Sequence, residues 1–284
     1  MKLLFTTDLH GVKWKYDQIY ELAKSLKVDV IINAGDMLPM KPNFFKQDDF
    51  IKSYLDSYFL RLDAEEILYL CFLGNDDLRI FDDLFESTCN KYAFIKNLTQ
   101  KTFKVRNLEF IGFNWIPDLP FGLKDRCRKD NKDFKFPKQI GKAILSNPSG
   151  LKEIDDWFSY ANTLPTIKDE LDQLARPIFM ENAIYIIHSP PSRLDLDVLN
   201  DGQKVGSEAV YNFLKENQPL ISFHGHVHES PNISKKWYSN LGRTLCIQPG
   251  QSEIYENFLI YVIIDLGDSN MIEFEKYKIS RTSL

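Results

Sequence analysis

The stretch KLLFTTDLHG, residues 2–11, is a run of strand-forming apolar residues that ends in a carboxylate, an imidazole and a glycine. Apolar residues at helical spacing follow at residues 16–26, so the chain begins with a predicted strand and a predicted helix. This alternation of a strand and a helix recurs along the first third of the chain. Strands are predicted at residues 28–33 and 67–73, with an amphipathic helix at residues 49–62 between them.

Polar side chains follow each of these predicted strands. They are Asp8, Gly35-Asp36 and Gly74-Asn75, and the pattern recurs where residues 183–187 lead into His188 and residues 219–223 lead into His224. In open α/β sheets, ligands bind outside the carboxyl ends of the strands, where loops bring together groups that are distant in sequence. We therefore expect these segments to form one site.

The rest of the chain divides into an insertion and a carboxyl-terminal part. Strands are predicted at residues 258–265 and 271–278, separated by the turn-like sequence GDSN at 267–270, and we expect them to join a second, more antiparallel sheet. Residues 115–181 are charged and contain several prolines, with helical stretches near 152–161 and 167–174. We interpret them as an insertion in a single domain that spans residues 1–284.

The first part of this insertion, residues 121–142, is rich in cations. Asp125, Asp130 and Asp133 are outnumbered there by Lys124, Arg126, Arg128, Lys129, Lys132, Lys135, Lys138 and Lys142. A solvated surface is the simple interpretation of this charge. The alternative is a segment that contacts substrate phosphate or closes over the site.

Composition limits the class of protein. The 284 residues carry a net charge of −5, which gives no overall attraction to nucleic acid or to an anionic membrane. The four cysteines are scattered and indicate neither a disulfide framework nor a zinc knuckle. The chain enters a strand at once without a basic leader, and no apolar run approaches the ~18 residues of a membrane span. We expect a cytoplasmic protein, and the sequence does not indicate its oligomeric state.

All five histidines lie in or beside a set of short blocks. The blocks are Asp8-Leu9-His10, Gly35-Asp36, Gly74-Asn75-Asp76-Asp77, His188-Ser189-Pro190-Pro191 and His224-Gly225-His226-Val227-His228. In this order they resemble the calcineurin-like metallophosphoesterase superfamily. Residues 206–219 further resemble its small prokaryotic members related to the cyclic-nucleotide phosphodiesterase branch. The resemblance implies an α/β fold, a four-layer sandwich of two mixed β-sheets flanked by helices.

The resemblance also implies two divalent metal ions. It assigns the first ion to Asp8, His10, Asp36 and His228, and the second to Asp36, Asn75, His188 and His226. Asp8 and His10 are two residues apart, so on extended backbone both side chains would reach one ion. Mixed oxygen and imidazole ligands suit transition metals, with manganese as the expected ion and iron, zinc or nickel as alternatives. Two such ions about 3.5–4 Å apart can activate a bridging hydroxide, so no side-chain nucleophile is required.

Two residues depart from the family pattern. Asp76 stands where most members have a histidine that assists the leaving group, and with a usual pKa of about 3.9 beside two dications it is a poor proton donor. We therefore expect phosphodiesters to be better substrates than phosphomonoesters. His224 has no ligand role in the family pattern; it either donates to the bound phosphate in place of Asp76 or is a packed histidine.

The predicted function is hydrolysis of a small phosphate ester, a phosphodiester in preference to a monoester. One alternative is a scaffold that keeps the fold and binds a partner without turnover. Another is a nuclease or a nucleotide pyrophosphatase of the same superfamily. A nuclease requires a basic groove beside the metals, and residues 121–142 are the candidate for such a groove.

Overall fold

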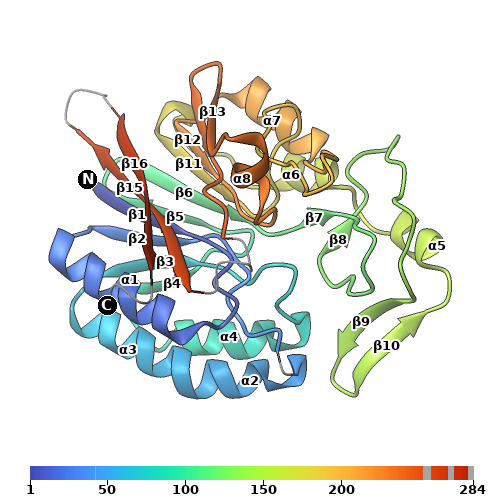
Figure 1. Ribbon diagram of the computed structural model, residues 1–284, viewed down its shortest axis with the longest axis horizontal. Coiled ribbons are helices and arrows are strands. Elements are labelled where there is room, and N and C mark those ends of the chain that lie inside the picture. The colour runs from blue at the N-terminus through green and yellow to red at the C-terminus, as the bar shows by residue number, and fades with distance from the viewer. Residues whose placement is uncertain (42, 252–256, 268–271, 281–284) are drawn as a thin grey trace.

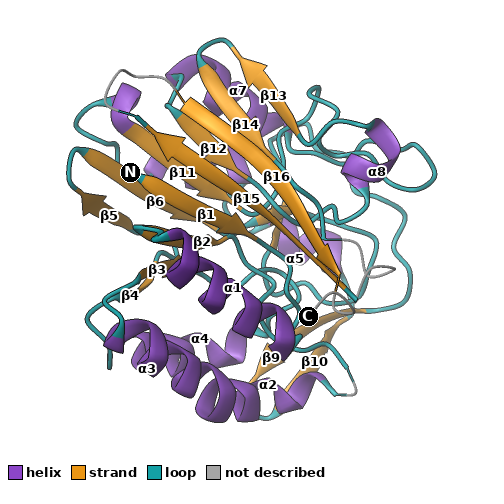
Figure 2. Ribbon diagram, turned by 60° about the vertical axis from the view of Figure 1, so that its left-hand side comes forward, coloured by secondary structure: helices purple, strands orange, loops and turns teal. Residues whose placement is uncertain are grey.

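The computed structural model describes residues 1–41, 43–251, 257–267 and 272–280. Two mixed six-stranded sheets lie face to face, and helices cover their outer faces (Figures 1 and 2). This arrangement confirms the predicted four-layer α/β sandwich. Among the described residues, no helix has the length and apolar content needed to cross a membrane.

The first sheet contains the amino-terminal strands in the order β16-β15-β1-β2-β3-β4. The strands are β1 (Lys2–Thr6), β2 (Val30–Asn33), β3 (Leu68–Cys71), β4 (Ile95–Asn97), β15 (Phe258–Leu266) and β16 (Ile272–Ser280). Strands β1 to β4 are mutually parallel, whereas β15 is antiparallel to both of its neighbours. The helices on the outer face are α1 (Lys13–Leu26), α2 (Gln47–Asp49), α3 (Asp56–Ala64) and α4 (Asp82–Cys89). A π-helical segment, Phe50–Leu55, joins α2 to α3 into one continuous helix, which confirms the helix predicted at 49–62.

The second sheet has the order β13-β14-β12-β11-β6-β5. Its strands are β5 (Thr102–Val105), β6 (Leu108–Phe113), β11 (Ala183–Ile187), β12 (Ile221–Phe223), β13 (Tyr238–Leu241) and β14 (Thr244–Ile247). The outer face packs against α6 (Ile167–Gln173) and α7 (Glu208–Asn217) through a buried apolar cluster. A second apolar cluster fills the space between the two sheets, and a short helix, α8 (Ser230–Ser234), follows the histidine-rich segment.

The prediction that residues 258–278 join the second sheet was wrong. Strand β15 pairs antiparallel with β1, from Lys2 opposite Asp265 to Phe5 opposite Val262. Alternate residues of β15 pack in different layers: Leu259 and Tyr261 lie in the cluster under the helices, and Val262 in the cluster between the sheets. Local patterning predicts a strand but not its partner, which is set by burial on both faces. Residues 268–270 of the predicted turn lie outside the described residues.

The insertion lies beside the two sheets (Figure 1). Its elements are β7 (Ile116–Pro117), β8 (Cys127–Arg128), β9 (Ala143–Asn147), β10 (Gly150–Ile154) and α5 (Trp157–Asn162), and it has a small apolar cluster of its own. The helix predicted from residue 152 was wrong at its start, because residues 150–154 pair antiparallel with β9. The helix begins only at Trp157, where the Asp156 side chain caps it by accepting from Ser159 N.

The cation-rich segment is in part internal. The ammonium group of Lys124 lies 2.8 Å from Asp118 Oδ1, and both side chains are fully buried. Arg126 and Arg128 are also buried, with Arg126 paired to Asp82 at 2.5 Å. The interpretation as a solvated surface was therefore wrong for these three cations, whereas Lys132, Lys135, Lys138 and Lys142 are exposed as expected. Lys124 pairs with an acid just before the counted segment, and Arg126 with one 44 residues away, so a charge count within residues 121–142 reveals neither pair.

We expect Lys124→Met to lower the free energy of unfolding by about 3–5 kcal/mol, because the variant leaves the Asp118 carboxylate buried without its cation. The double variant Lys124→Met with Asp118→Leu should recover most of this loss, since it removes both charges. Urea unfolding of the three proteins measures the effect. A single variant as stable as the parent would show that the pair does not hold the insertion together.

Candidate metal centre

The polar residues that follow the parallel strands meet at one edge of the sandwich. Asp8, Asp36 and Asn75 follow β1, β2 and β3 of the first sheet, and His188 follows β11 of the second. Because the carboxyl ends of parallel strands lie at the same edge, side chains up to 220 residues apart become neighbours. The two sheets thus supply opposite sides of one site.

Two groups of side chains in the described residues have the spacing of metal ligands. The ligand atoms within each group lie within 4.8 Å of one another; the groups are Asp8, His10, Asp36 and His228, and Asp36, His188 and His226. Asp36 belongs to both groups. Asn75 joins the second group, since its Oδ1 lies 2.8 Å from His188 Nε2. The structure therefore brings together all seven residues that the sequence predicts as ligands.

The first group places nitrogen and oxygen atoms around one point. His10 Nε2 lies 3.1 Å from His228 Nε2, and His228 Nε2 lies 3.6 Å from Asp8 Oδ1. Burial disfavours a charged His228, but the carboxylate of Asp8 outweighs it and raises the pKa of His228 to about 9. The surroundings therefore favour positive charge at this point.

The second group is oriented by a hydrogen bond outside it. His188 Nδ1 donates to the carbonyl of Ala34 at 2.7 Å, which fixes the ring orientation and directs Nε2 at Asp36 Oδ2, 3.3 Å away. Burial opposes a charged His188, yet Asp36 raises its pKa to about 9 and the imidazole in turn lowers the pKa of Asp36. Asp36 Oδ2 is buried and makes no hydrogen bond, so this oxygen remains for a cation.

The backbone at the ligands differs from the extended geometry expected for Asp8 and His10. Strand β1 ends at Thr6, and the φ angles of Asp8, His10, Asp36 and His226 are 55°, 45°, 50° and 69°. Non-glycine residues seldom occupy this left-handed region, and each costs of the order of 1–3 kcal/mol. Hydrogen bonds from Asp8 N to Gly35 O and from His10 N to Asp36 O stabilise the conformation. Tight loops, and not a shared strand face, bring these two side chains to one point.

The glycines beside the ligands are required by close approach. A Cβ atom at Gly74 would lie 2.2 Å from Asp36 Oδ1, and a Cβ atom at Gly225 would lie 2.0 Å from Thr7 Oγ1. Neither position has room for a methyl group, because the neighbouring loops pack directly against the backbone.

Asp77 connects two of the ligand loops. Its buried carboxylate accepts hydrogen bonds from the backbone N–H groups of Met37, Leu38 and Gly74 at 2.7–2.9 Å. Burial and the charge of Asp36 raise the pKa of Asp77 to about 7. Asp77 therefore orients the two ligand loops and does not bind metal itself.

Asp76 lies at the centre of the site but is held by its neighbours. Its N–H donates to Asp36 Oδ1 at 2.8 Å, and its carboxylate accepts from Asn75 Nδ2 at 3.0 Å. From the protein groups alone, burial and the charge of Asp36 raise the pKa of Asp76. Bound dications would act in the opposite direction.

His224 is packed inside the second sheet. Its Nδ1 lies 3.0 Å from the carbonyl oxygens of Ile187 and Ser189, and its Nε2 lies 2.8 Å from Ser222 Oγ. Burial lowers its pKa to about 4. Both ring nitrogens contact protein groups, which agrees with the packed histidine and not with a donor to phosphate.

Arg126 is a residue at the site that the sequence did not single out. Its Nε donates to the carbonyl of Gly74 at 2.7 Å, directly before the ligand Asn75, and its guanidinium pairs with Asp82. The insertion is thereby attached to a metal loop. Because 52 residues separate the partners, no local pattern could have indicated this contact.

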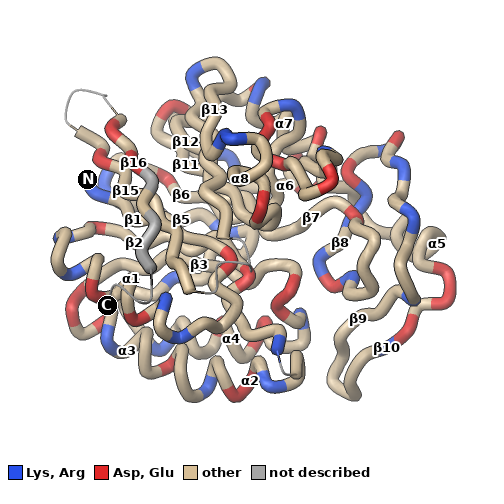
Figure 3. The backbone as a smooth tube through the Cα atoms, viewed as in Figure 1, with Lys and Arg blue, Asp and Glu red and all other residues tan. Residues whose placement is uncertain are grey.

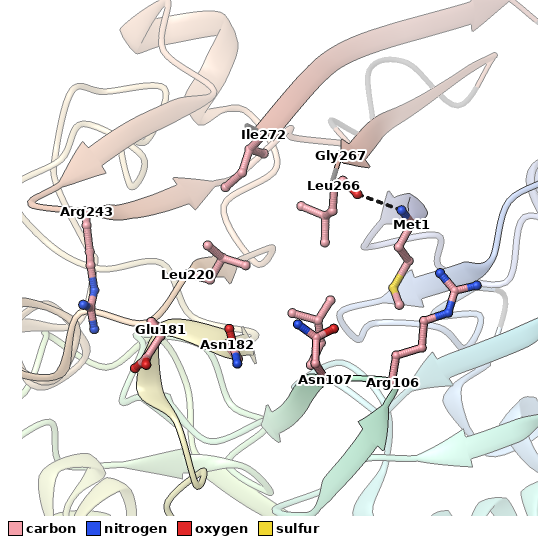
Figure 4. Close-up of a pocket in the computed structure, with 11 residues that line it drawn as sticks. Met1, Arg106, Asn107, Glu181, Asn182, Leu220, Arg243, Leu266, Gly267 and Ile272 are labelled. Atoms are coloured by element: carbon pink, nitrogen blue, oxygen red, sulfur yellow. Dashed lines mark hydrogen bonds between the residues drawn. The ribbon is translucent and has the colours of Figure 1, made fainter. Parts of the chain in front are cut away.

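A separate cavity of about 480 Å³ lies near Met1, Arg106 and Arg243 (Figure 4). Met1 precedes β1, so this cavity adjoins the amino end of a strand whose carboxyl end leads to the ligands. None of the seven candidate ligands lines it. It is therefore distinct from the metal centre.

We expect Mn²⁺ to raise the melting temperature of the metal-stripped protein, because a ligand at 100 times its Kd stabilises the folded state by about 2.7 kcal/mol. Asp36→Ala should abolish the shift, since it removes the carboxylate common to both groups. Asp155→Ala, which removes an exposed carboxylate of the insertion, is the matched control and should keep the shift. Thermal unfolding of the wild type and the two variants, with and without Mn²⁺, measures the shift in melting temperature. A wild-type protein whose melting temperature does not change would contradict the assignment.

We expect Gly74→Ala to weaken Mn²⁺ binding by at least about tenfold, because its methyl group would displace Asp36 Oδ1. Gly141→Ala introduces a methyl group at another glycine, one with a positive φ but open space around it, and should leave the affinity unchanged. Titration calorimetry of both variants provides the measurement. If Gly74→Ala and Gly141→Ala bind Mn²⁺ with equal affinity, the packing at Gly74 does not position Asp36.

Comparisons with known proteins agree with this geometry. The model of the family described as calcineurin-like phosphoesterase matches residues 1–230. No curated protein matches the sequence.

Similar solved structures share the fold over almost the whole chain. The protein TT1561 of Thermus thermophilus is 15% identical with a TM-score of 0.56, covering 96% of this chain and 97% of that chain. A dimetal phosphatase from Danio rerio is 12% identical with a TM-score of 0.55, covering 99% and 98%. GAP50, the anchor in the inner membrane complex of Plasmodium, is 12% identical with a TM-score of 0.51, covering 99% and 88%. At these identities the likeness concerns the fold alone.

The family match covers most of the chain and includes every block that contributes to the metal centre. The family uses divalent metal ions, in keeping with the ligand groups described above. With its sandwich fold and its two ligand groups joined by Asp36, this chain belongs to the calcineurin-like phosphoesterase family.

Proposed function

We propose that the protein is a two-metal phosphoesterase that hydrolyses small phosphate esters and prefers phosphodiesters. The observation that carries the proposal is the position of Asp36, whose carboxylate belongs to both ligand groups. A carboxylate shared in this way can hold two cations at the spacing that phosphate-ester hydrolysis requires. The ligand set of carboxylates, one carboxamide and imidazoles suits manganese first and iron, zinc or nickel as alternatives.

The protein residues have separate tasks in this function. Bound divalent ions would supply positive charge for the phosphoryl oxygens and lower the pKa of water. The backbone N–H of Asp76 and the loop held by Asp77 keep the Asp36 carboxylate in one orientation. His188 is fixed in its ligand tautomer by the carbonyl of Ala34. This preorganisation reduces the rearrangement needed when substrate binds.

Asp76 supports the preference for diesters. It occupies the place beside Asn75, and with two dications present its carboxylate would be ionised and unable to protonate a leaving group. A dianionic monoester is also repelled by this carboxylate more strongly than a monoanionic diester. His224 does not substitute as a donor, since its ring nitrogens contact protein groups.

The charge distribution does not favour a nuclease. Lys124, Arg126 and Arg128 of the cation-rich segment are buried. Figure 3 shows lysine and arginine interspersed with aspartate and glutamate along the insertion. A small substrate fits this surface better than a nucleic acid, which requires a continuous basic groove.

We expect the Mn²⁺-loaded protein to hydrolyse bis-p-nitrophenyl phosphate with a kcat/KM at least about tenfold above that for p-nitrophenyl phosphate. The two esters release the same leaving group, so the ratio reports the charge and the substituent of the phosphate. Metal stripping and Asp36→Ala should each abolish turnover. Asp76→His should raise the rate for a simple alkyl phosphomonoester relative to the diester rate, because it restores a proton donor for a basic alkoxide leaving group.

Two results would contradict the proposal. Equal or faster hydrolysis of a simple alkyl phosphomonoester would remove the diester preference. If protein whose melting temperature shows that Mn²⁺ is bound hydrolyses neither nitrophenyl ester, the result would favour the non-catalytic scaffold.

A further inference from the structure

A cavity of about 840 Å³ opens beside the metal centre. His226 of the second ligand group and its neighbour Val227 are part of its lining. The other walls come from residues 117–121 and 130–137 of the insertion and from residues 199–206. Its volume lies within the range of about 300–1,000 Å³ that is typical of small-molecule sites.

Apolar side chains line much of this cavity. They include Leu119, Phe121, Phe134, Leu199 and Val205. Phe121 is 62% exposed and Val205 is 37% exposed, so both present apolar surface to solvent. Apolar surface in a concave site next to reactive groups is typical of substrate recognition.

The charged residues of the lining are mostly acidic. Two lysines are outnumbered by six carboxylates, which are Asp118, Asp130, Asp133, Asp201, Glu208 and Glu229. Ion pairs with residues outside the lining neutralise Lys204 (with Asp195), Asp118 (with Lys124) and Glu208 (with Arg193). Four carboxylates, those of Asp130, Asp133, Asp201 and Glu229, then remain against Lys135. An anionic group in this cavity would therefore be repelled, whereas an uncharged group would not.

The walls are attached to the sandwich and preformed. The buried carboxylate of Asp130 accepts from the hydroxyl of Ser207 and from the backbone N–H groups of Glu208 and Ala209 at the start of α7. On the other side, the buried Lys124–Asp118 pair holds the segment that begins the insertion. These contacts attach both walls of the cavity to the rest of the fold.

We propose that this cavity binds the ester substituent of the substrate and selects an uncharged, apolar or aromatic group. The inference rests on the proposed function and adds the substrate class to it. Phe121, Phe134 and Val205 contact the substituent, while Asp133 and Asp201, both exposed at the cavity, exclude anionic substituents. The preferred substrate is thus a diester with one apolar arm and no further negative charge.

The first test compares methyl p-nitrophenyl phosphate with phenyl p-nitrophenyl phosphate, which share a charge and the nitrophenolate leaving group. Val205→Trp fills the cavity and should lower kcat/KM for the phenyl ester about tenfold more than for the methyl ester, because one buried ring contributes roughly that factor. Phe121→Ala should also lower kcat/KM for the phenyl ester more than for the methyl ester, because the phenyl group loses its contact with the Phe121 ring. Ile140→Trp, at an exposed insertion residue outside the lining, is the control and should change neither value.

The second test concerns charge. The double variant Asp133→Lys with Asp201→Lys should raise kcat/KM for a 4-carboxyphenyl ester relative to the phenyl ester by about three- to tenfold, and high salt should remove the gain. Glu66→Lys with Glu181→Lys changes the net charge equally at exposed residues before the amino ends of β3 and β11. This control should leave the ratio unchanged.

The outcomes separate the two proposals. If the Mn²⁺-bound protein hydrolyses neither diester, the proposed function fails and the substrate assignment fails with it. If both diesters are hydrolysed but Val205→Trp and Phe121→Ala affect them equally, the function stands and the cavity assignment is wrong. A parent protein that prefers the carboxylated ester would overturn the exclusion of anions.

Discussion

The carboxylate of Asp36 is the point on which the two halves of the metal centre depend. It follows β2 in the first sheet, lies 3.3 Å from His188 of the second sheet, and belongs to both ligand groups. Because it is fully buried, its negative charge is not screened by water and strongly favours neighbouring cations. The stacking of the two sheets brings the edges of both to this carboxylate, so the sandwich is also the scaffold of the site.

Strained loops around Asp36 are stabilised by groups that do not bind metal. Four of the seven candidate ligands have left-handed backbone conformations, each of which costs free energy. The hydrogen bonds of Asp77 to the loops at Met37 and Gly74, and of Arg126 to the carbonyl of Gly74, offset this cost. The insertion therefore contributes to the precision of the metal centre as well as to the cavity beside it.

Charge has opposite roles on the two sides of the site. At the ligand groups, carboxylates face imidazoles and create a place for cations and, through them, for phosphate. In the cavity next to His226, carboxylates such as Asp133 and Asp201 face solvent together with apolar side chains. This separation of charge supports the proposed small diester substrate over a polyanion.

The sequence by itself determined the alternation of strands and helices and the positions of the polar groups after the strands, because apolar periodicity and residue chemistry are local properties. Its resemblance to a known family supplied the candidate metal ligands. Only the tertiary structure decided that β15 pairs with β1, that Asp8 and His10 approach through left-handed loops, and that Lys124, Arg126 and Arg128 are buried. Strand partners, backbone conformation at close approaches and ion pairs between distant segments depend on which surfaces are buried together. Which surfaces are buried together depends on the packing of the whole chain, so no single segment of the sequence indicates it.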